Sequence, residues 1–280
     1  MTASEPVAPT IEYLDRRGGR IAYQVSGTGP LVVCVPGMGE LRSSFRFLVP
    51  DLVTAGFRVA VLDIRGHGDS DATFGSYDDV ALAGDIRALV EHLGGPAAVV
   101  GSSMGAAASV LAAVEHGELF SALVMTGPFV RDVPLSKMQT WMMRAAMGGP
   151  WARRVWLSYY PKFYPGTPPA DFEQHRAEIG AAMQRKGHRA AFTKTTRTSH
   201  SPADAVLDSV RTRTLVVMGA QDPDFPDPTA EAHMIASRVH GRAEIVAESG
   251  HYPHAQRPNL VSPLVIDFLT SVTRSVPNGD

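Results

Sequence analysis

Residues 97–115 read AAVVGSSMGAAASVLAAVE, and this segment gives the clearest indication of the fold class. Its first part, AAVVGS, is a short and almost wholly apolar run, which suits a parallel strand covered on both faces. Its last part is rich in alanine and suits a helix. The run GSSMG at 101–105 joins them as a G-x-S-x-G pattern between strand and helix. We expect Ser103 to lie on a strained turn, where the flanking glycines let strand and helix approach closely.

Other short runs extend this pattern in both directions. They are LVVCVP (31–36), FRVAVLD (57–63), ALVMTGP (122–128), TLVVMGA (214–220) and AEIVAES (243–249). Segments with helical spacing lie between them, and residues 78–93 are one example. TIEYLDRR (10–17) and RIAYQVSG (20–27), separated by a Gly-Gly pair, predict a hairpin at the sheet edge. Together the segments predict an α/β fold: a mostly parallel eight-stranded sheet with helices on both faces.

The alternation of strand and helix stops after Pro128 and resumes only near Thr214. Four segments in this gap read as helices bounded by Pro or Gly, which predicts a helical cap inserted after the sixth strand. The expected parts are a catalytic domain, the cap and two flexible tails. The catalytic domain comprises residues 10–129 and 206–274, and the cap comprises residues 130–205. The tails are residues 1–9 and 275–280.

Composition excludes several classes of protein. With 280 residues, 44% of them hydrophobic and 19% charged, the chain can bury a large core. Its 26 basic and 28 acidic side chains give no positive excess, so we expect a small-molecule substrate and no nucleic acid. A single cysteine, Cys34, and the lack of a signal peptide or long apolar run predict a cytoplasmic location without a membrane span. The composition fits either a monomer or a dimer.

A serine hydroxyl needs a base to become a nucleophile, and histidine is the usual base near neutral pH. His251 follows the last apolar run, so it should lie on a loop at the same carboxyl edge of the sheet as Ser103. His254 is expected to face elsewhere, and His67 to be structural. Ser102 competes with Ser103, but only Ser103 has a glycine two residues before and two residues after it.

The third member of such a site is a buried carboxylate that orients the imidazole. Asp222, Asp224 and Asp227 follow the run TLVVMGA and are all candidates by position. Asp222 is nearest the strand end and ranks first, with Asp224 second, because Asp227 is well placed to cap the helix that begins at Pro228.

An oxyanion needs a pair of donors, each with an effect of roughly 3 to 4 kcal/mol on the barrier. The backbone N–H of Met104, directly after Ser103, is one candidate. The N–H of Met38, in the glycine-containing loop after the third strand, is the other. No metal is needed for this chemistry.

Five motifs in order resemble the α/β-hydrolase family, and in particular its cap-bearing serine hydrolases. Besides GSSMG they are VVCVPGMG (32–39), LDIRGHGDSD (62–71), GAQDPDFP (219–226) and SGHYPHAQRP (249–258). The chain order Ser103, Asp222, His251 is the order of that family. Many members have His-Gly where this chain has Pro36-Gly37, which leaves a backbone donor possible but removes a histidine side chain.

The resemblance implies hydrolysis of a carboxylic ester or lactone through an acyl-enzyme, without a cofactor. A C–C bond hydrolase of a keto-acid, a thioesterase and a perhydrolase use the same three residues, and a slow-turnover ligand receptor can also retain them. Epoxide hydrolases and haloalkane dehalogenases have a similar cap but an aspartate nucleophile, so Ser103 argues against both. Asp63 and Arg65, in the loop after the fourth strand, are expected to be structural.

The expected cap carries the leads on substrate. Its aromatic and methionine side chains should mainly pack the cap onto the sheet, but such side chains also line pockets for bulky apolar ligands. The candidate substrate contacts are Trp141, Met142, Trp156 and Tyr160. Residues 130–200 carry a net charge of +8 and the remainder −10, which reflects either solvated helix faces or attraction of an anionic substrate.

Overall fold

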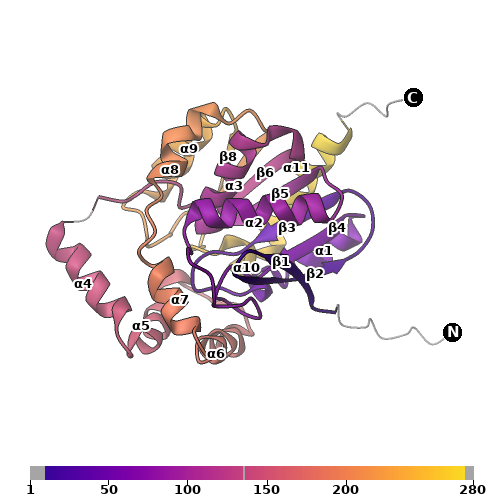
Figure 1. Cartoon of the computed structure of the whole chain (residues 1–280). Helices are drawn as coiled ribbons and strands as arrows, with labels where there is room; N and C mark the ends of the chain where they lie inside the picture. The colour runs from indigo at the N-terminus through magenta and orange to yellow at the C-terminus, as the bar shows by residue number, and fades with distance from the viewer. Residues whose placement is uncertain (1–9, 135, 275–280) are drawn as a thin grey trace.

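A computed structural model describes residues 10–134 and 136–274; both expected tails lie outside these described residues. Its centre is an eight-stranded sheet with the strand order β1-β2-β4-β3-β5-β6-β7-β8 (Figure 1). The strands are β1 (Glu12–Arg16), β2 (Gly19–Ser26), β3 (Leu31–Val35), β4 (Arg58–Leu62), β5 (Ala97–Ser102), β6 (Phe120–Thr126), β7 (Thr214–Gly219) and β8 (Arg242–Val246). Strand β2 pairs antiparallel with both β1 and β4, and the remaining pairs are parallel. The predicted hairpin and mostly parallel sheet are confirmed.

Helices cover both faces of this sheet. The helices of the described residues, including those that stand apart from the sheet, are α1 (Leu48–Thr54), α2 (Asp79–His92), α3 (Met104–Glu115), α4 (Lys137–Gly148), α5 (Ala152–Tyr159), α6 (Phe172–Ala182), α7 (His188–Thr195), α8 (Ser201–Val206), α9 (Pro228–Arg238), α10 (Pro253–Gln256) and α11 (Pro258–Arg274). Short 3-10 turns are η1 (Arg42–Phe45), η2 (Gly117–Leu119), η3 (Tyr160–Phe163) and η4 (Leu207–Ser209). None of the described helices is both long and apolar enough to cross a membrane.

The apolar runs form strands because their side chains alternate between two cores. In β3, Val33 and Val35 pack into a core with α2, α3 and α9, whereas Val32 and Cys34 pack into a core with α1 and α11. Every residue of β3 and β5 is buried. A strand that contributes to two cores must be apolar at every position, which is why these runs show no polar alternation.

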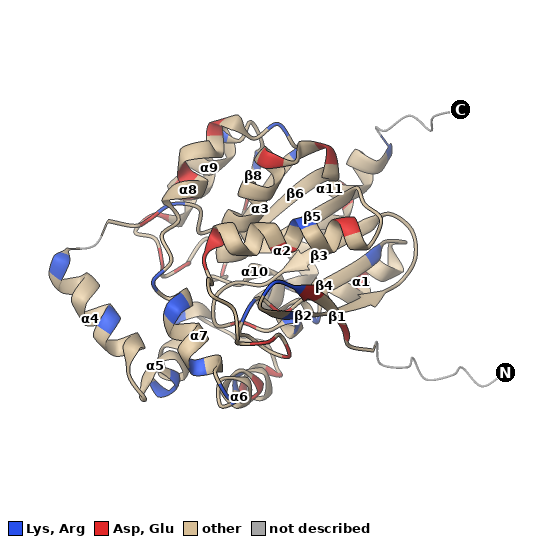
Figure 2. Cartoon of the chain, viewed as in Figure 1, with Lys and Arg blue, Asp and Glu red and all other residues tan. Residues whose placement is uncertain are grey.

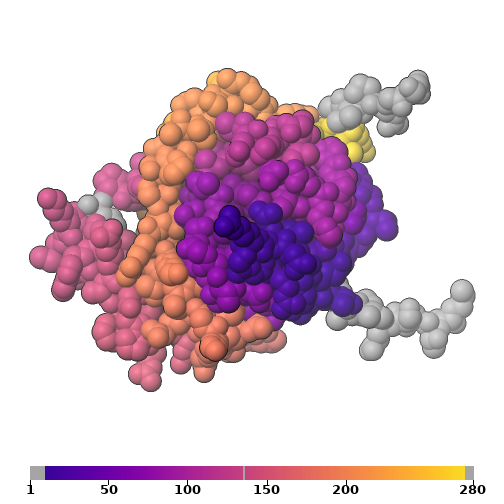
Figure 3. All heavy atoms as spheres, in the orientation of Figure 1, coloured from indigo at the N-terminus to yellow at the C-terminus, as the bar shows by residue number. Residues whose placement is uncertain are grey.

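Helices α4 to α7 lie between β6 and β7 in the chain and stand apart from the sheet (Figures 1 and 3). A third core joins this segment to the body, with Trp156, Tyr160 and Phe192 from the segment and Tyr252 from the loop after β8. Helix α8 packs instead against α2 and α3 of the body. Its position favours a cap boundary nearer residue 200 than 205. Lysine and arginine side chains are frequent on α4, α5 and α7 (Figure 2).

The two connections of this segment to the body are hydrogen-bonded to each other. On the outgoing connection, the Asp132 carboxylate accepts bonds from the His200 backbone N–H at 2.8 Å and from the Ser199 hydroxyl at 2.5 Å, both on the returning connection. The His200 ring also bonds Asp79 at the start of α2, with 2.7 Å between Nδ1 and Oδ2. Arg131 forms an ion pair with Glu231 of α9. The segment therefore leaves and re-enters the body at one point.

The start of α3 lies so close to the end of β3 that no side chain would fit at Gly105. A Cβ atom on Gly105 would lie 2.4 Å from the carbonyl oxygen of Val35 and 2.9 Å from that of Pro36. A Cβ atom on Gly101 would lie 2.6 Å from the carbonyl oxygen of Gly105. Glycine at these two positions is what lets strand, turn and helix meet.

We expect Gly105→Ala to lower the free energy of unfolding by about 1–3 kcal/mol, although alanine is the better helix former, because the new Cβ meets backbone that cannot move aside. Urea denaturation followed by circular dichroism measures this change. Gly117→Ala is the matched control, since nothing lies within 4 Å of its Cβ position. Equal stability of the two variants would contradict the close approach.

Candidate active site

Ser103 occupies the turn between β5 and α3 with φ 52° and ψ −120°, a left-handed conformation that costs an L-residue on the order of 1–3 kcal/mol. Its N–H donates to the Thr126 carbonyl at 3.1 Å, and its own carbonyl accepts from the Phe129 N–H at 3.3 Å. Its side chain is partly exposed. Ser102, by contrast, is fully buried, and its hydroxyl has no hydrogen-bond partner among the described residues. Of the two serines, Ser103 is therefore the accessible one.

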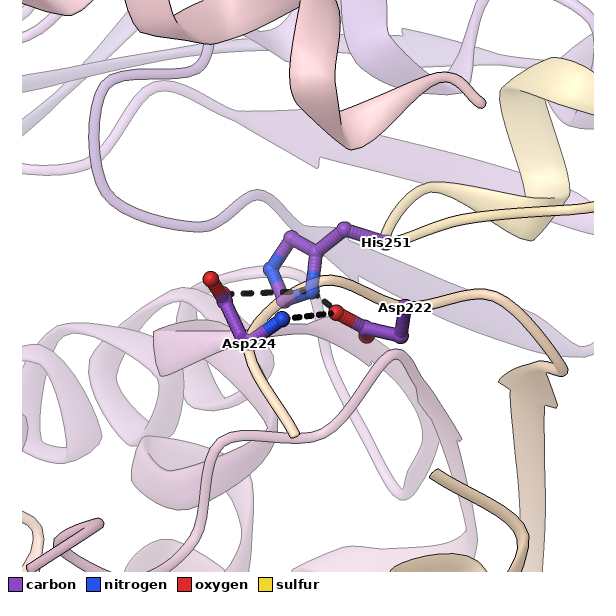
Figure 4. A group of neighbouring side chains, drawn as sticks. All are labelled: Asp222, Asp224 and His251. Atoms are coloured by element: carbon purple, nitrogen blue, oxygen red, sulfur yellow. Dashed lines mark hydrogen bonds and ion pairs between the residues drawn. The ribbon is translucent and has the colours of Figure 1, made fainter. Parts of the chain in front are cut away.

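His251 lies on the loop after β8, with its ring against two carboxylates (Figure 4). Its Nδ1 is 2.8 Å from Asp222 Oδ2 and 3.6 Å from Asp224 Oδ2. The Asp224 N–H donates to the other oxygen of Asp222 at 3.0 Å, which fixes that carboxylate. Asp227 instead caps α9, accepting from the Ala230 N–H at 2.9 Å. The structure thus brings Asp222 nearest to His251 and places Asp227 in the capping position.

The hydrogen bond to Asp222 sets the tautomer of His251. A carboxylate only accepts, so in the neutral ring Nδ1 carries the proton and Nε2 can accept another; the neutral ring predominates only above the pKa of His251. Burial opposes the charged imidazolium, but the negative charges of Asp222 and Asp224 outweigh burial and raise the pKa of His251 to about 9. Burial also raises the pKa of the Asp224 carboxyl, while the His251 charge counteracts that effect.

The loop that carries His251 packs onto the turn that supports Ser103. Gly127 directly follows Thr126, whose carbonyl holds the Ser103 N–H. A Cβ atom on Gly127 would lie 2.2 Å from the His251 carbonyl oxygen and 3.4 Å from its Nδ1. The loop that carries His251 and the strand end that supports Ser103 are therefore in direct contact at Gly127.

The loop after β3, residues 36–40, lies beside Ser103. A Cβ atom on Gly37 would lie 2.7 Å from Ser103 Cβ, so the backbone here touches the turn directly. Two groups hold the loop at Gly39: its N–H donates to His67 Nε2 at 3.0 Å, and its carbonyl accepts from the Trp156 indole at 3.3 Å. Met38 lies in the chain between Gly37, which touches Ser103, and Gly39, which these two groups hold. Met104, on the opposite side, begins α3, so its N–H is among those that a helix leaves unpaired.

His67 is placed to hold this loop, a more specific role than the general structural one expected. Its Nε2 accepts from Gly39, so its Nδ1 carries the proton and donates to the Arg65 carbonyl at 2.9 Å. Burial lowers the pKa of His67 to about 4, which keeps the ring neutral and able to accept. Asp63 and Arg65, expected to be structural, form ion pairs with Arg42 and Asp85 respectively.

A buried carboxylate, Glu40, was missed by the sequence reasoning. It is fully buried two residues after Met38, and it accepts hydrogen bonds from the Tyr160 hydroxyl and from His175 Nε2, the latter at 3.0 Å. Both donors belong to the segment between β6 and β7. No local sequence signal marks Glu40, because a glutamate in a loop is ordinarily exposed and only partners distant in the chain accompany its burial here.

The structure separates the four candidate substrate contacts into two pairs. Trp141 and Met142 are exposed on α4, whereas Trp156 and Tyr160 are buried in the third core. Other aromatic rings lie nearer the site. These are Phe163, whose ring centroid is 5.1 Å from that of His251, and the tilted pair Phe129 and Phe225, whose centroids are 5.4 Å apart.

His254 has a different environment from His251. It is buried and stacks on Phe45 at 4.7 Å between ring centroids, and neither ring nitrogen has a hydrogen-bond partner among the described residues. Burial lowers its pKa to about 3, with the nearby charge of Arg46 acting in the same direction. It is directed away from the carboxylates, as expected.

One oxygen from each of Asp222 and Asp224 and one nitrogen of His251 lie within 4.8 Å of one another, a spacing that a divalent cation could bridge. However, Nδ1 must carry a proton to donate to Asp222, and a protonated nitrogen cannot bind a metal. A cavity of about 740 Å³ lies elsewhere, between α1, β4 and α6, and none of Ser103, Asp222 and His251 lines it.

The model of the alpha/beta hydrolase family matches residues 32–263. The chain is an alpha/beta hydrolase.

Relatives of this alpha/beta hydrolase span most of its length. It is 28% identical over 265 residues to a 2-(acetamidomethylene)succinate hydrolase of Mesorhizobium japonicum, covering 90% of this chain and 92% of that protein. Its fold resembles a bromoperoxidase from Bacillus anthracis (TM-score 0.80, 19% identity, 94% of this chain and 100% of that one). It also resembles an esterase from Thermogutta terrifontis (TM-score 0.77, 23% identity), with 91% of this chain and 94% of that one covered. At these identities the two structures show a shared fold.

We expect Asp222→Asn to lower the pKa of His251 well below 9, because an amide carries no charge and cannot outweigh the burial of the ring. Asp224→Asn should lower it less, since the longer 3.6 Å separation weakens the attraction. NMR titration of the imidazole protons measures both. If the pKa of His251 fell equally in the two variants, the orienting role would belong to both carboxylates rather than to Asp222 alone.

Proposed function

We propose that this alpha/beta hydrolase is a serine hydrolase that cleaves a carboxylic ester or lactone of a small, largely hydrophobic substrate. The observation that carries the proposal is the orientation of His251: its Nδ1 lies 2.8 Å from Asp222, so the neutral ring presents Nε2 as the base. Beside it, Ser103 is the accessible serine on a strained turn. An oriented base and a presented hydroxyl are the two requirements of nucleophilic catalysis.

In the proposed mechanism His251 Nε2 takes the proton of the Ser103 hydroxyl as its oxygen attacks the carbonyl carbon. The imidazolium then returns the proton to the leaving alcohol, and an acyl-enzyme remains. A water molecule, activated by the same nitrogen, releases the acid and restores the serine. The described structure has no hydrogen bond between Ser103 and His251, and such contacts often tighten only when substrate is bound.

The oxyanion that forms during attack is assigned to two backbone amides, those of Met38 and Met104. The close contact of Gly37 with Ser103 brings the first amide near the reacting atoms, and the N-terminus of α3 supplies the second. His67 and Trp156 keep the first amide in place through Gly39. No metal or organic cofactor takes part in these steps.

Aromatic side chains around the site support a hydrophobic substrate. Phe163 lies against His251. Phe129 is partly exposed, its backbone N–H donates to the Ser103 carbonyl, and its ring packs at a tilt against Phe225. Trp141 and Met142, by contrast, are exposed on α4, and Trp156 and Tyr160 are buried in the third core. The named activities of relatives, a succinate-derivative hydrolase and an esterase among them, are consistent with hydrolysis at a carbonyl.

Ser103→Ala is expected to reduce kcat for 4-nitrophenyl esters by about 10⁴-fold or more, since the reaction loses its nucleophile. It should also abolish labelling by a fluorophosphonate probe. Ser102→Ala is the matched control: it removes a neighbouring hydroxyl that has no partner among the described residues, so activity and labelling should persist. Full activity of the Ser103 variant would refute the mechanism, whereas rapid labelling without turnover would indicate a ligand receptor.

Substrate size gives a separate test. We expect kcat/KM to be higher for 4-nitrophenyl 1-naphthoate than for 4-nitrophenyl acetate, because a bulky acyl group contacts the aromatic walls. Phe129→Ala should reduce kcat/KM for the naphthoate roughly tenfold and for the acetate much less. Phe47, also partly exposed but in contact with Arg46, provides the control Phe47→Ala. Equal kcat/KM for the two esters would rule out a hydrophobic acyl site.

A further inference from the structure

Helix α4 presents apolar side chains that nothing in the described structure covers. Within the described residues the large exposed apolar side chains concentrate on α4 and the turn after it: Met138 (65% exposed), Trp141 (67%), Met142 (58%), Met143 (45%) and Trp151 (51%). We call these five side chains the cap patch. No residue of α4 is buried. Trp151 belongs to the patch because its indole N–H donates to the carbonyl of Ala145 in α4 at 3.0 Å.

Three side chains of the cap patch lie on the side of α4 opposite its contact with the third core. Met138, Trp141 and Met142 are spaced by three and four residues, so they share one face of the helix. Met147 lies on a different face, is partly buried and packs against the third core. The helix therefore uses one side to contact the protein and leaves its larger apolar side chains on another. Figure 3 shows this segment projecting from the rest of the molecule.

Positive charge surrounds the patch without compensating carboxylates. Between Val133 and Ala170 the chain has five basic residues and no acidic one. Two arginines of the α7 region also approach the end of α4: Arg189 donates to the Gly149 carbonyl at 3.2 Å, and Arg197 lies near Gly148. The seven cations are Lys137, Arg144, Arg153, Arg154, Lys162, Arg189 and Arg197. None of them forms an ion pair with a carboxylate of the described residues, and they account for much of the blue on α4, α5 and α7 in Figure 2.

This combination selects one kind of partner. Tryptophan and methionine on one helix face, flanked by unpaired lysine and arginine, are typical of helices that lie in a membrane interface. A second copy of the chain would bring a second set of like charges to the same surface, which opposes a two-fold contact. We infer that the cap patch docks on the surface of an anionic lipid bilayer, with α4 lying in the plane of the headgroups.

The inference goes beyond the proposed hydrolase activity and does not depend on it. Docking requires the apolar side chains of the cap patch and the adjacent cations, and neither group belongs to the site around Ser103. Binding can therefore be measured with the Ser103→Ala variant as well as with the unmodified protein. Failure to dock would leave the catalytic proposal unaffected, and loss of catalysis would leave docking unaffected.

The test is co-sedimentation of the full chain with vesicles of phosphatidylglycerol and phosphatidylcholine in equal parts, compared with pure phosphatidylcholine. Binding is expected to the anionic vesicles, to weaken as salt is added, and to shift the tryptophan emission to shorter wavelength as Trp141 enters the interface. Trp141→Ala with Met142→Ala should weaken binding by tenfold or more, roughly the effect of removing two large apolar side chains from lipid.

Charge is tested separately from apolar burial. Lys137→Gln and Arg144→Gln should each weaken binding to anionic vesicles roughly fivefold, corresponding to about 1 kcal/mol per cation near the surface. Leu260→Ser and Arg17→Gln are matched controls, because each alters an exposed side chain of the same kind on the body. Both should bind vesicles as the unmodified protein does.

Three results would overturn the inference. One is the absence of binding to anionic vesicles at low salt. Another is equal binding by the patch variant and by the Leu260→Ser control. The third is a dimer in analytical ultracentrifugation that the Trp141 and Met142 substitutions dissociate, combined with no vesicle binding, which would assign the patch to a contact between copies. Circular dichroism should show unchanged helix content in the variants, since α4 has no buried residue.

Discussion

The backbone at Ser103 is held in a conformation that an L-residue does not adopt without support, and the structure around it is arranged to supply that support. Three glycines make room for it: Gly37 against its side chain, Gly101 at the strand end and Gly105 in the helix. Each would place a Cβ atom within 2.7 Å of a neighbouring atom. The order of strands in the centre of the sheet follows from the same need, because β3 and β5 are adjacent and must end side by side.

The segment between β6 and β7 is part of the site's framework as well as its cover. Through Trp156 it holds Gly39, and through Tyr160 and His175 it satisfies the buried charge of Glu40. A buried carboxylate without such partners would be strongly destabilising, so the loop after β3 and this segment depend on each other. A change in the segment's packing should therefore alter the position of the loop even when no catalytic group is touched.

Sequence was sufficient for the sheet because two-sided burial leaves a direct trace in composition, as in LVVCV and AAVVGS. It was also sufficient to bring Ser103, Asp222 and His251 to one edge, because the carboxyl ends of parallel strands coincide. It could not separate Trp141 from Trp156, since both lie in helical runs and only tertiary packing decides which face meets the body. Glu40 and His175 are 135 positions apart, and no local pattern relates them.

The meeting of Asp132 with Ser199 and His200 has a consequence for how this molecule can change over evolutionary time. An insertion whose two ends are bonded to each other leaves the body and returns to it at one place. The length, the number of helices and the surface of the insertion can change, or the whole insertion can be exchanged. The spacing between β6 and β7 stays the same. New substrate preferences and new surfaces can then arise in the insertion without changes in the sheet.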